Sequence, residues 1–69
     1  MNGTIKKLMG QRGFGFIVTD TGQEYFFHMS GVQGVHFDEL REGQQVEFSV
    51  ENDPRGRGER AVKVRLIRG

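Results

Sequence analysis

Ring side chains occur close together in two short segments of the chain. Phe14 and Phe16 alternate with glycines, and Phe26 and His28 follow in the next segment. An aromatic ring can stack on the face of a nucleic-acid base, and lysine or arginine can bind the phosphates. Glycines at 13 and 15 keep neighbouring side chains off the rings, so bases could lie flat on them. The basic residues that could follow the phosphates are Lys6, Lys7, Arg12, Lys63 and Arg65.

The sequence offers no set of residues that indicates catalysis or metal binding. It has no cysteine, and two histidines without a second ligand cluster argue against a structural zinc site. His28 has no carboxylate at a spacing that suggests a general base. Gly13-x-Gly15 lies inside a predicted strand and does not precede a helix, so it does not indicate a phosphate loop. We therefore predict a binding protein that is not an enzyme and needs no metal or cofactor.

Short segments of alternating polarity predict an all-β fold. Eleven glycines and a single proline in 69 residues oppose a helical bundle and suit short strands and tight turns. The connection over residues 29–43 has room for one helical turn at most. Five strands with the longest connection after the third predict one domain, 1–69, folded as a five-stranded antiparallel β-barrel of OB type. The predicted strands cover residues 3–9 (with a possible bulge), 12–18, 24–28, 44–51 and 60–67.

Alternation also predicts which side chains face outward. On the second and third strands the outward set would be Phe14, Phe16, Phe26 and His28. The inward set would be Gly15, Ile17, Tyr25 and Phe27. A register shifted by one residue would exchange the two sets and leave an equally apolar outside. On the fourth strand the pattern places Val46, Phe48 and Val50 on one face, opposite Gln45, Glu47 and Ser49. On the fifth it places Val62, Val64 and Leu66 opposite Lys63, Arg65 and Ile67.

The net charge of +1 hides an uneven distribution along the chain. Residues 1–18 carry +3, residues 19–53 carry −7 and residues 54–69 carry +5. Two basic ends around an acidic middle can give a barrel one positive side that attracts polyanions, although an uneven solvated surface is the alternative. Arg55 and Arg57 fall in the loop between the last two strands. OB folds use this loop for oligonucleotides, and a plain hairpin loop is the alternative there.

The series of motifs resembles the bacterial cold-shock proteins over nearly the whole chain. Residues 12–17, RGFGFI, resemble the first RNP motif, and residues 25–29, YFFHM, occupy the place of the second. RRM domains carry a related run, but they need two full helices that this chain does not supply. The remaining matches are Gly3, Gly34-x-x-Phe37, Leu40-x-Glu42-Gly43-Gln44-x-Val46-x-Phe48 and Ala61-x-x-Val64.

The resemblance implies a barrel that binds single-stranded RNA or DNA and melts weak RNA secondary structure. It implies stacking by Phe14, Phe16, Phe26, His28 and Phe37, with basic contacts from Lys6 and Arg12. The chain departs from the family pattern where Lys7 replaces a tryptophan, Leu8 and Met29 replace phenylalanines, and Lys63 replaces an asparagine. Tyr25 and Phe27 replace valines and could fill the core more heavily. Relative to the family pattern, this chain has fewer aromatic rings for stacking and more positively charged side chains.

We therefore predict a single-stranded nucleic-acid-binding protein that acts as an RNA chaperone or modulates transcription or translation. The alternative is a protein-interaction barrel that binds a peptide or subunit on the same face. With no apolar run near 18 residues and no apolar segment after the first lysines, we expect a soluble, cytoplasmic protein without membrane contact. We expect a monomer, and a dimer formed by strand exchange stays open. The predicted binding residues are Lys6, Lys7, Arg12, Phe14, Phe16, Phe26, His28, Phe37, Arg55, Arg57 and Lys63.

Overall fold

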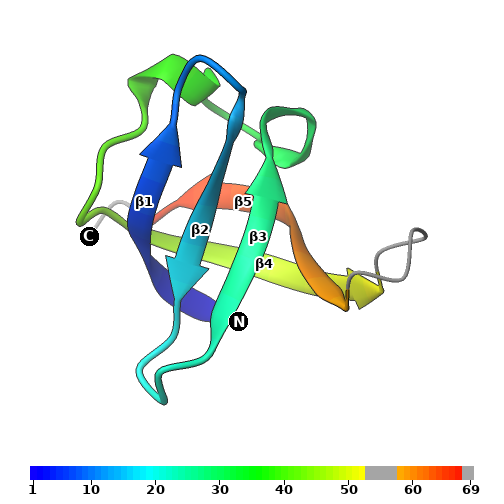
Figure 1. Cartoon of the computed structure of the whole chain (residues 1–69). Helices are drawn as coiled ribbons and strands as arrows, with labels where there is room; N and C mark the ends of the chain where they lie inside the picture. Colours follow the sequence, from blue (N-terminus) through cyan, green and yellow to red (C-terminus); the bar gives the residue numbers. More distant parts are fainter. Residues whose placement is uncertain (53–57, 68–69) are drawn as a thin grey trace.

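Five strands close into a barrel in the computed structural model, which describes residues 1–52 and 58–67. They are β1 (Asn2–Met9), β2 (Phe14–Val18), β3 (Glu24–His28), β4 (Gln45–Asn52) and β5 (Glu59–Leu66). Figure 1 shows β1, β2 and β3 side by side, with β4 and β5 running across behind them. The order around the barrel is β1-β2-β3-β5-β4, which confirms the predicted five-stranded OB-type fold.

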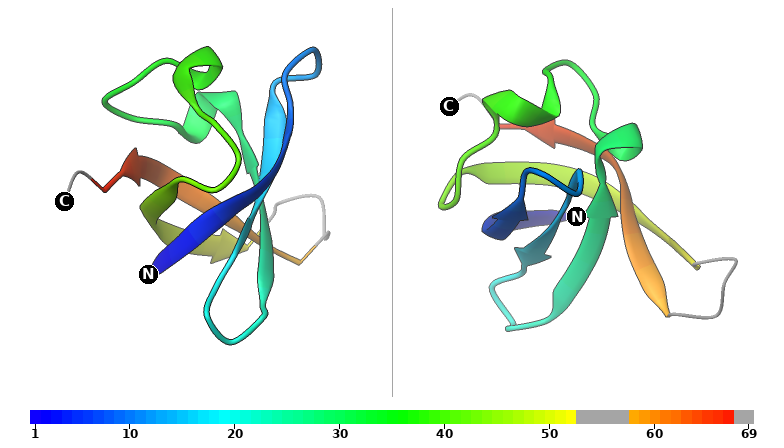
Figure 2. Two further views of the ribbon diagram at one scale, coloured as in Figure 1. Left: turned by 90° about the vertical axis from the view of Figure 1, so that its left-hand side faces the viewer. Right: turned by 45° about the horizontal axis from the view of Figure 1, so that its top comes forward.

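The strand pairs are antiparallel except where β3 meets β5. That pair is parallel, with Phe26 opposite Arg60, and it joins the three-stranded layer to the β4–β5 layer. The connection between β3 and β4 contains two single-turn 3-10 helices, η1 (Met29–Gly31) and η2 (Phe37–Glu39), so the prediction of one helical turn at most was wrong. Figure 2 shows this connection spanning the two layers at one end of the barrel. Within residues 1–52 and 58–67, no helix is long and apolar enough to cross a membrane.

The predicted bulge in β1 lies at Lys6. Ile5 pairs with Ile17 and Lys7 pairs with Phe16, so β1 has one residue more than β2 between these pairs. A bulge of this kind shifts the alternation of a strand by one position. Ile5 is buried and Leu8 packs against the core, while the two lysines between them are both exposed.

A second bulge, in β5, corrects the predicted faces of that strand. The pairs Ser49–Val62 and Glu47–Arg65 enclose one residue of β4 but two of β5. Lys63 lies there with φ of 53°, in the left-handed region that side chains rarely adopt. Ala61 and Val64 are consequently both buried, and Val62, which was predicted to share a face with Val64, is on the outer face with Ser49. The extra residue breaks the two-residue period on which the prediction rested.

The core is built mainly from the predicted inward positions. Gly15 is buried among them. No side chain fits at this position, because a Cβ would lie 2.9 Å from the ring of Phe27 and 2.6 Å from the carbonyl oxygen of Lys7. Only glycine lets β1 and the Phe27 ring approach this point so closely. The buried apolar residues are Ile5, Ile17, Tyr25, Phe27, Leu40, Val46, Phe48, Ala61 and Val64.

Candidate nucleic-acid interface

Three phenylalanines form one cluster on the outer face of β2 and β3. The ring centroids of Phe14 and Phe26 lie 5.3 Å apart with an angle of 37° between the planes. Phe16 is 6.1 Å from Phe14 and 6.0 Å from Phe26 and meets both rings edge-on. All three side chains are half-buried, while Ile17, Tyr25 and Phe27 are buried, so the predicted register is confirmed.

The strand register extends this cluster into two rows across the barrel. Paired residues on neighbouring strands point to the same face. The first row consists of Lys7, Phe16, Phe26, Arg60 and Glu51, and it crosses all five strands. The second consists of Met9, Phe14 and His28. We call Phe14, Phe16, Phe26 and His28 the aromatic face.

His28 completes the aromatic face next to η1. Its Nδ1 accepts a hydrogen bond from the Ser30 backbone N–H at 3.2 Å and lies 2.9 Å from the Ser30 hydroxyl. Because a backbone N–H can only donate, Nδ1 is the acceptor and the neutral ring carries its proton on Nε2. The exposed ring therefore combines a stacking surface with a hydrogen-bond donor at Nε2.

The predicted basic residues differ in how close they lie to the rings. Lys7 is exposed and directly opposite Phe16. The Lys6 ammonium reaches across β2 to the Glu24 carboxylate at 2.9 Å, with about half of each side chain accessible. An exposed pair of this kind contributes about 1 kcal/mol or less to stability, so a phosphate could replace the carboxylate. Arg12 is exposed in the turn between β1 and β2.

The other predicted site residues lie away from the three-ring cluster or outside the described residues. Phe37 is half-buried in η2 and packs on Phe27, with ring centroids 6.0 Å apart, so it also supports the core. Lys63 is exposed on β5, beside a hollow that His28 also lines. Arg55 and Arg57 fall outside residues 1–52 and 58–67.

Sequence reasoning missed Arg60 and Glu51 as neighbours of the aromatic face. The Arg60 guanidinium donates to Glu51 Oε1 from Nη2 at 2.7 Å and from Nε at 3.3 Å. Its position beside Phe26 depends on the parallel β3–β5 pairing. The sequence signals only that Arg60 belongs to a basic segment, because strands distant in the chain do not reveal their mutual register.

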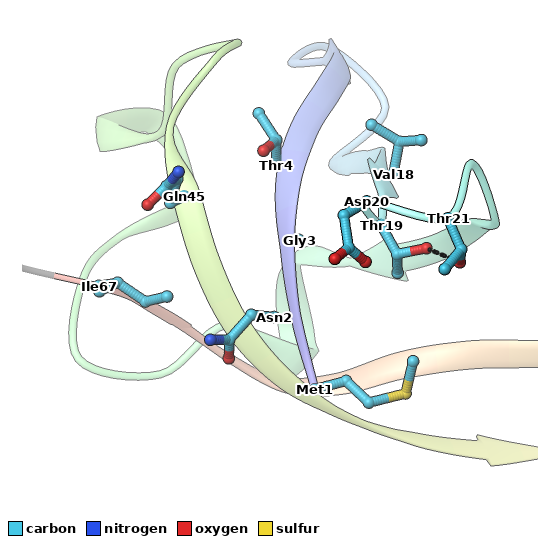
Figure 3. A pocket seen from close by; sticks show the side chains of 10 residues that line it. All are labelled: Met1, Asn2, Gly3, Thr4, Val18, Thr19, Asp20, Thr21, Gln45 and Ile67. Atoms are coloured by element: carbon cyan, nitrogen blue, oxygen red, sulfur yellow. Dashed lines mark hydrogen bonds between the residues drawn. The ribbon is translucent and has the colours of Figure 1, made fainter.

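Another hollow lies elsewhere on the barrel and has a different character. It measures about 780 Å³ and lies between the first residues of β1, the loop after β2 and the start of β4 (Figure 3). Thr19 and Thr21 share a hydrogen bond of 2.9 Å there, and Asp20 contributes a carboxylate. No ring or basic side chain is among its described lining residues. A hollow without rings offers no surface on which a base could stack, so the aromatic face is the candidate interface.

Metal binding finds no support in the described part of the chain. Residues 1–52 and 58–67 contain no group of three or more histidine, aspartate or glutamate side chains that could hold an ion.

Comparisons with known proteins agree with this architecture. Residues 1–67 match the family model described as the 'Cold-shock' DNA-binding domain. The chain is 48% identical over 54 residues to a major cold shock protein of Streptococcus pyogenes, which covers 78% of this chain and 81% of that protein. It is 44% identical over 55 residues to the major cold shock protein CspA of Pseudomonas aeruginosa, covering 80% of each chain. It is 44% identical over 54 residues to the cold shock protein CspC of Bacillus subtilis, covering 78% of this chain and 82% of that protein. The chain therefore belongs to the cold-shock domain family.

Proposed function

We propose that the chain binds single-stranded RNA or DNA by stacking bases on the aromatic face and holding phosphates with the neighbouring basic side chains. The observation that supports this most directly is the cluster of Phe14, Phe16 and Phe26, which stays half-exposed on one side of the barrel. Exposed apolar rings lower the solubility of a small protein, so a cluster of three on one face indicates a binding site for a ligand. The family match supports nucleic acid as that ligand.

The geometry favours unpaired bases over a duplex. In a duplex the base faces are stacked on one another and cannot reach a protein ring. Each base stacked on an aromatic side chain contributes about 1–3 kcal/mol and shows little sequence preference. A protein that binds only unpaired bases shifts a weak hairpin toward its melted form, because binding stabilises that state alone. This is the chemistry of an RNA chaperone, and it would also let the protein modulate transcription or translation in the cytoplasm.

Phosphate binding is assigned to the basic side chains around the rings. Lys7 lies beside Phe16, and Lys6 is held nearby by Glu24. We assign further phosphate contacts to Arg12 and Lys63, and to Arg55 and Arg57 on the strength of the sequence. Phe37 and His28 would provide stacking surfaces at the end of the barrel near η1 and η2.

The test is a fluorescence titration of the protein with oligo-U, oligo-dT and a matched duplex, each at two salt concentrations. Sedimentation first verifies that the protein is a monomer. We expect the single strands to bind at least about tenfold more tightly than the duplex and to lose affinity steeply with salt. Equal affinity for the duplex would refute the proposal. Binding of peptides on the same face with little salt dependence would instead favour a protein-interaction barrel.

A further inference from the structure

Arg60 continues the aromatic face onto β5. It is the parallel-strand partner of Phe26, and Glu51 is its antiparallel partner on β4. Phe26, Arg60 and Glu51 therefore point to the same side of the barrel as neighbours in one row. A nucleic-acid strand whose base stacks on Phe26 and that continues over β5 would bring its next nucleotide to Arg60.

Glu51 holds the Arg60 guanidinium in one orientation. Its Oε1 accepts hydrogen bonds from Nη2 at 2.7 Å and from Nε at 3.3 Å. These bonds use Nε and one N–H of Nη2, while Nη1 and the second N–H of Nη2 lie at the far end of the planar group. The Arg60 side chain is 36% exposed and that of Glu51 50%, so part of the ion pair is open to a ligand.

A hollow of about 270 Å³ lies beside this ion pair. His28 and Gln33 line it from the β3 side, and Arg60, Lys63 and Glu51 line it from β5 and β4. The His28 ring belongs to the aromatic face, so the hollow is continuous with it. Lys63 adds a cation that could hold the phosphate of a nucleotide placed here.

We propose that Arg60, positioned by Glu51, recognises guanine at the nucleotide that follows the base on Phe26. Guanine presents two acceptors side by side, O6 and N7, which match the two parallel N–H groups of an arginine fork. Adenine has a donor in place of O6, and uracil and cytosine have no N7. Stacking on the rings shows little sequence preference, so this contact would make the chain select guanine at one position. The inference rests on the proposed function.

The experiment is a scan of guanine through an eight-residue oligo-U, measured by fluorescence at one fixed salt concentration. We expect one position to bind at least about fivefold more tightly than oligo-U itself, the lower end of the range for a bidentate contact. Arg60→Lys keeps the charge but lacks the fork, so it should reduce this preference to less than about twofold while its affinity for oligo-U stays within about twofold of wild type. Glu51→Gln should also reduce the guanine preference without weakening oligo-U binding.

Arg65→Lys is the matched control. The sequence suggests Arg65 as a phosphate contact, but the structure pairs it with Glu47 of β4 at 4.0 Å, near the opposite end of β5 from Arg60, so we do not place it in the binding site. Its guanine preference should equal that of wild type, and circular dichroism should show that all variants are folded. A flat guanine scan for the wild type, or a preference that survives Arg60→Lys, would overturn the inference while leaving the proposed function intact if oligo-U binds. Failure of oligo-U to bind at all would refute the proposed function itself.

Discussion

Lys7 and Phe16 are cross-strand partners on the outer face of the barrel, so an ammonium group lies directly beside a stacking ring. The bulge at Lys6 makes this pairing possible. Ile5 points into the core, and strict alternation would turn the side chain of Lys7 inward as well. The extra residue keeps Ile5 and Leu8 against the core and both lysines outside. Lys7 therefore lies beside the aromatic face with its ammonium group exposed, and no free energy is lost by burying the charge.

Lys7 should contribute charge in place of stacking. Each phosphate neutralised on a single strand adds about −0.7 to the slope of log K against log salt. Lys7→Ala should make the slope shallower by about that amount and weaken binding to all sequences similarly. Lys7→Trp should also flatten the slope, but it should raise affinity by adding a ring next to Phe16. The measurement is a salt titration with oligo-U, with Arg65→Ala as a variant that should leave the slope nearly unchanged. An unchanged slope for Lys7→Ala would remove Lys7 from the interface.

The rings of the aromatic face should matter more for binding than for folding. Replacing Phe14, Phe16 or Phe26 by alanine should each cost about 1–3 kcal/mol in oligo-U binding. The loss of folding stability should be about 1 kcal/mol, because each ring is already half-exposed and has mainly its ring neighbours to lose. Ile17→Ala, in the core, should instead cost about 2–5 kcal/mol in stability. Titrations and urea unfolding measure the two effects. A ring variant less stable than Ile17→Ala would contradict this assignment.

Glu24 should restrain Lys6 and so weaken binding. Glu24→Gln removes the ion pair to the Lys6 ammonium and one negative charge two residues from Phe26 on β3, so oligo-U affinity at low salt should rise severalfold. Folding stability should change by no more than about 1 kcal/mol because the pair is exposed. Glu47→Gln is the matched control, since it breaks the pair with Arg65 away from the rings. Equal gains in both variants would show that only total charge matters.

Gly15 should be intolerant of any side chain. In Gly15→Ala the new Cβ would meet the Lys7 carbonyl oxygen at 2.6 Å and the Phe27 ring at 2.9 Å. Relieving this contact requires β1 to move away from β2, so we expect a loss of about 1–3 kcal/mol in unfolding free energy. Gly10→Ala is the control, because nothing lies within 4 Å of its Cβ and it should be neutral. Urea midpoints of the two variants test this. Similar midpoints would show that the sheet yields easily there.

Lys63 should be retained for its charge at a cost in stability. At φ of 53° a residue with a Cβ, other than asparagine or aspartate, is strained by about 1–2 kcal/mol. Lys63→Gly should relieve this strain, and its higher unfolded-state entropy should reduce the net gain to about 0.5–1 kcal/mol. Arg65→Gly, at a position with ordinary backbone on the same strand, should destabilise instead. Calorimetry gives both shifts. Oligo-U binding by Lys63→Gly should have a shallower salt slope, and a destabilised Lys63→Gly would contradict the strain argument.

Alternation within single strands was enough to predict much of this site from the sequence. On β2 and β3 it separates Phe14, Phe16, Phe26 and His28 from Ile17, Tyr25 and Phe27, and the burial of these residues confirms it. It succeeds because these strands are joined by a short turn and contain no bulge, so the two-residue period is unbroken. The consecutive pairing of β1, β2 and β3 and the possible bulge in β1 were predictable on the same basis.

The tertiary structure alone decided what lies on the far side of β3. The bulge at Lys63 shifts the period of β5, which buries Ala61 with Val64 and turns Val62 outward. The parallel closure between β3 and β5 then brings Arg60 beside Phe26, although 33 residues separate them in the chain. The alternation of residues within one strand cannot predict that Arg60 and Phe26 are neighbours. The register between strands distant in sequence is set by how the whole barrel closes around its core.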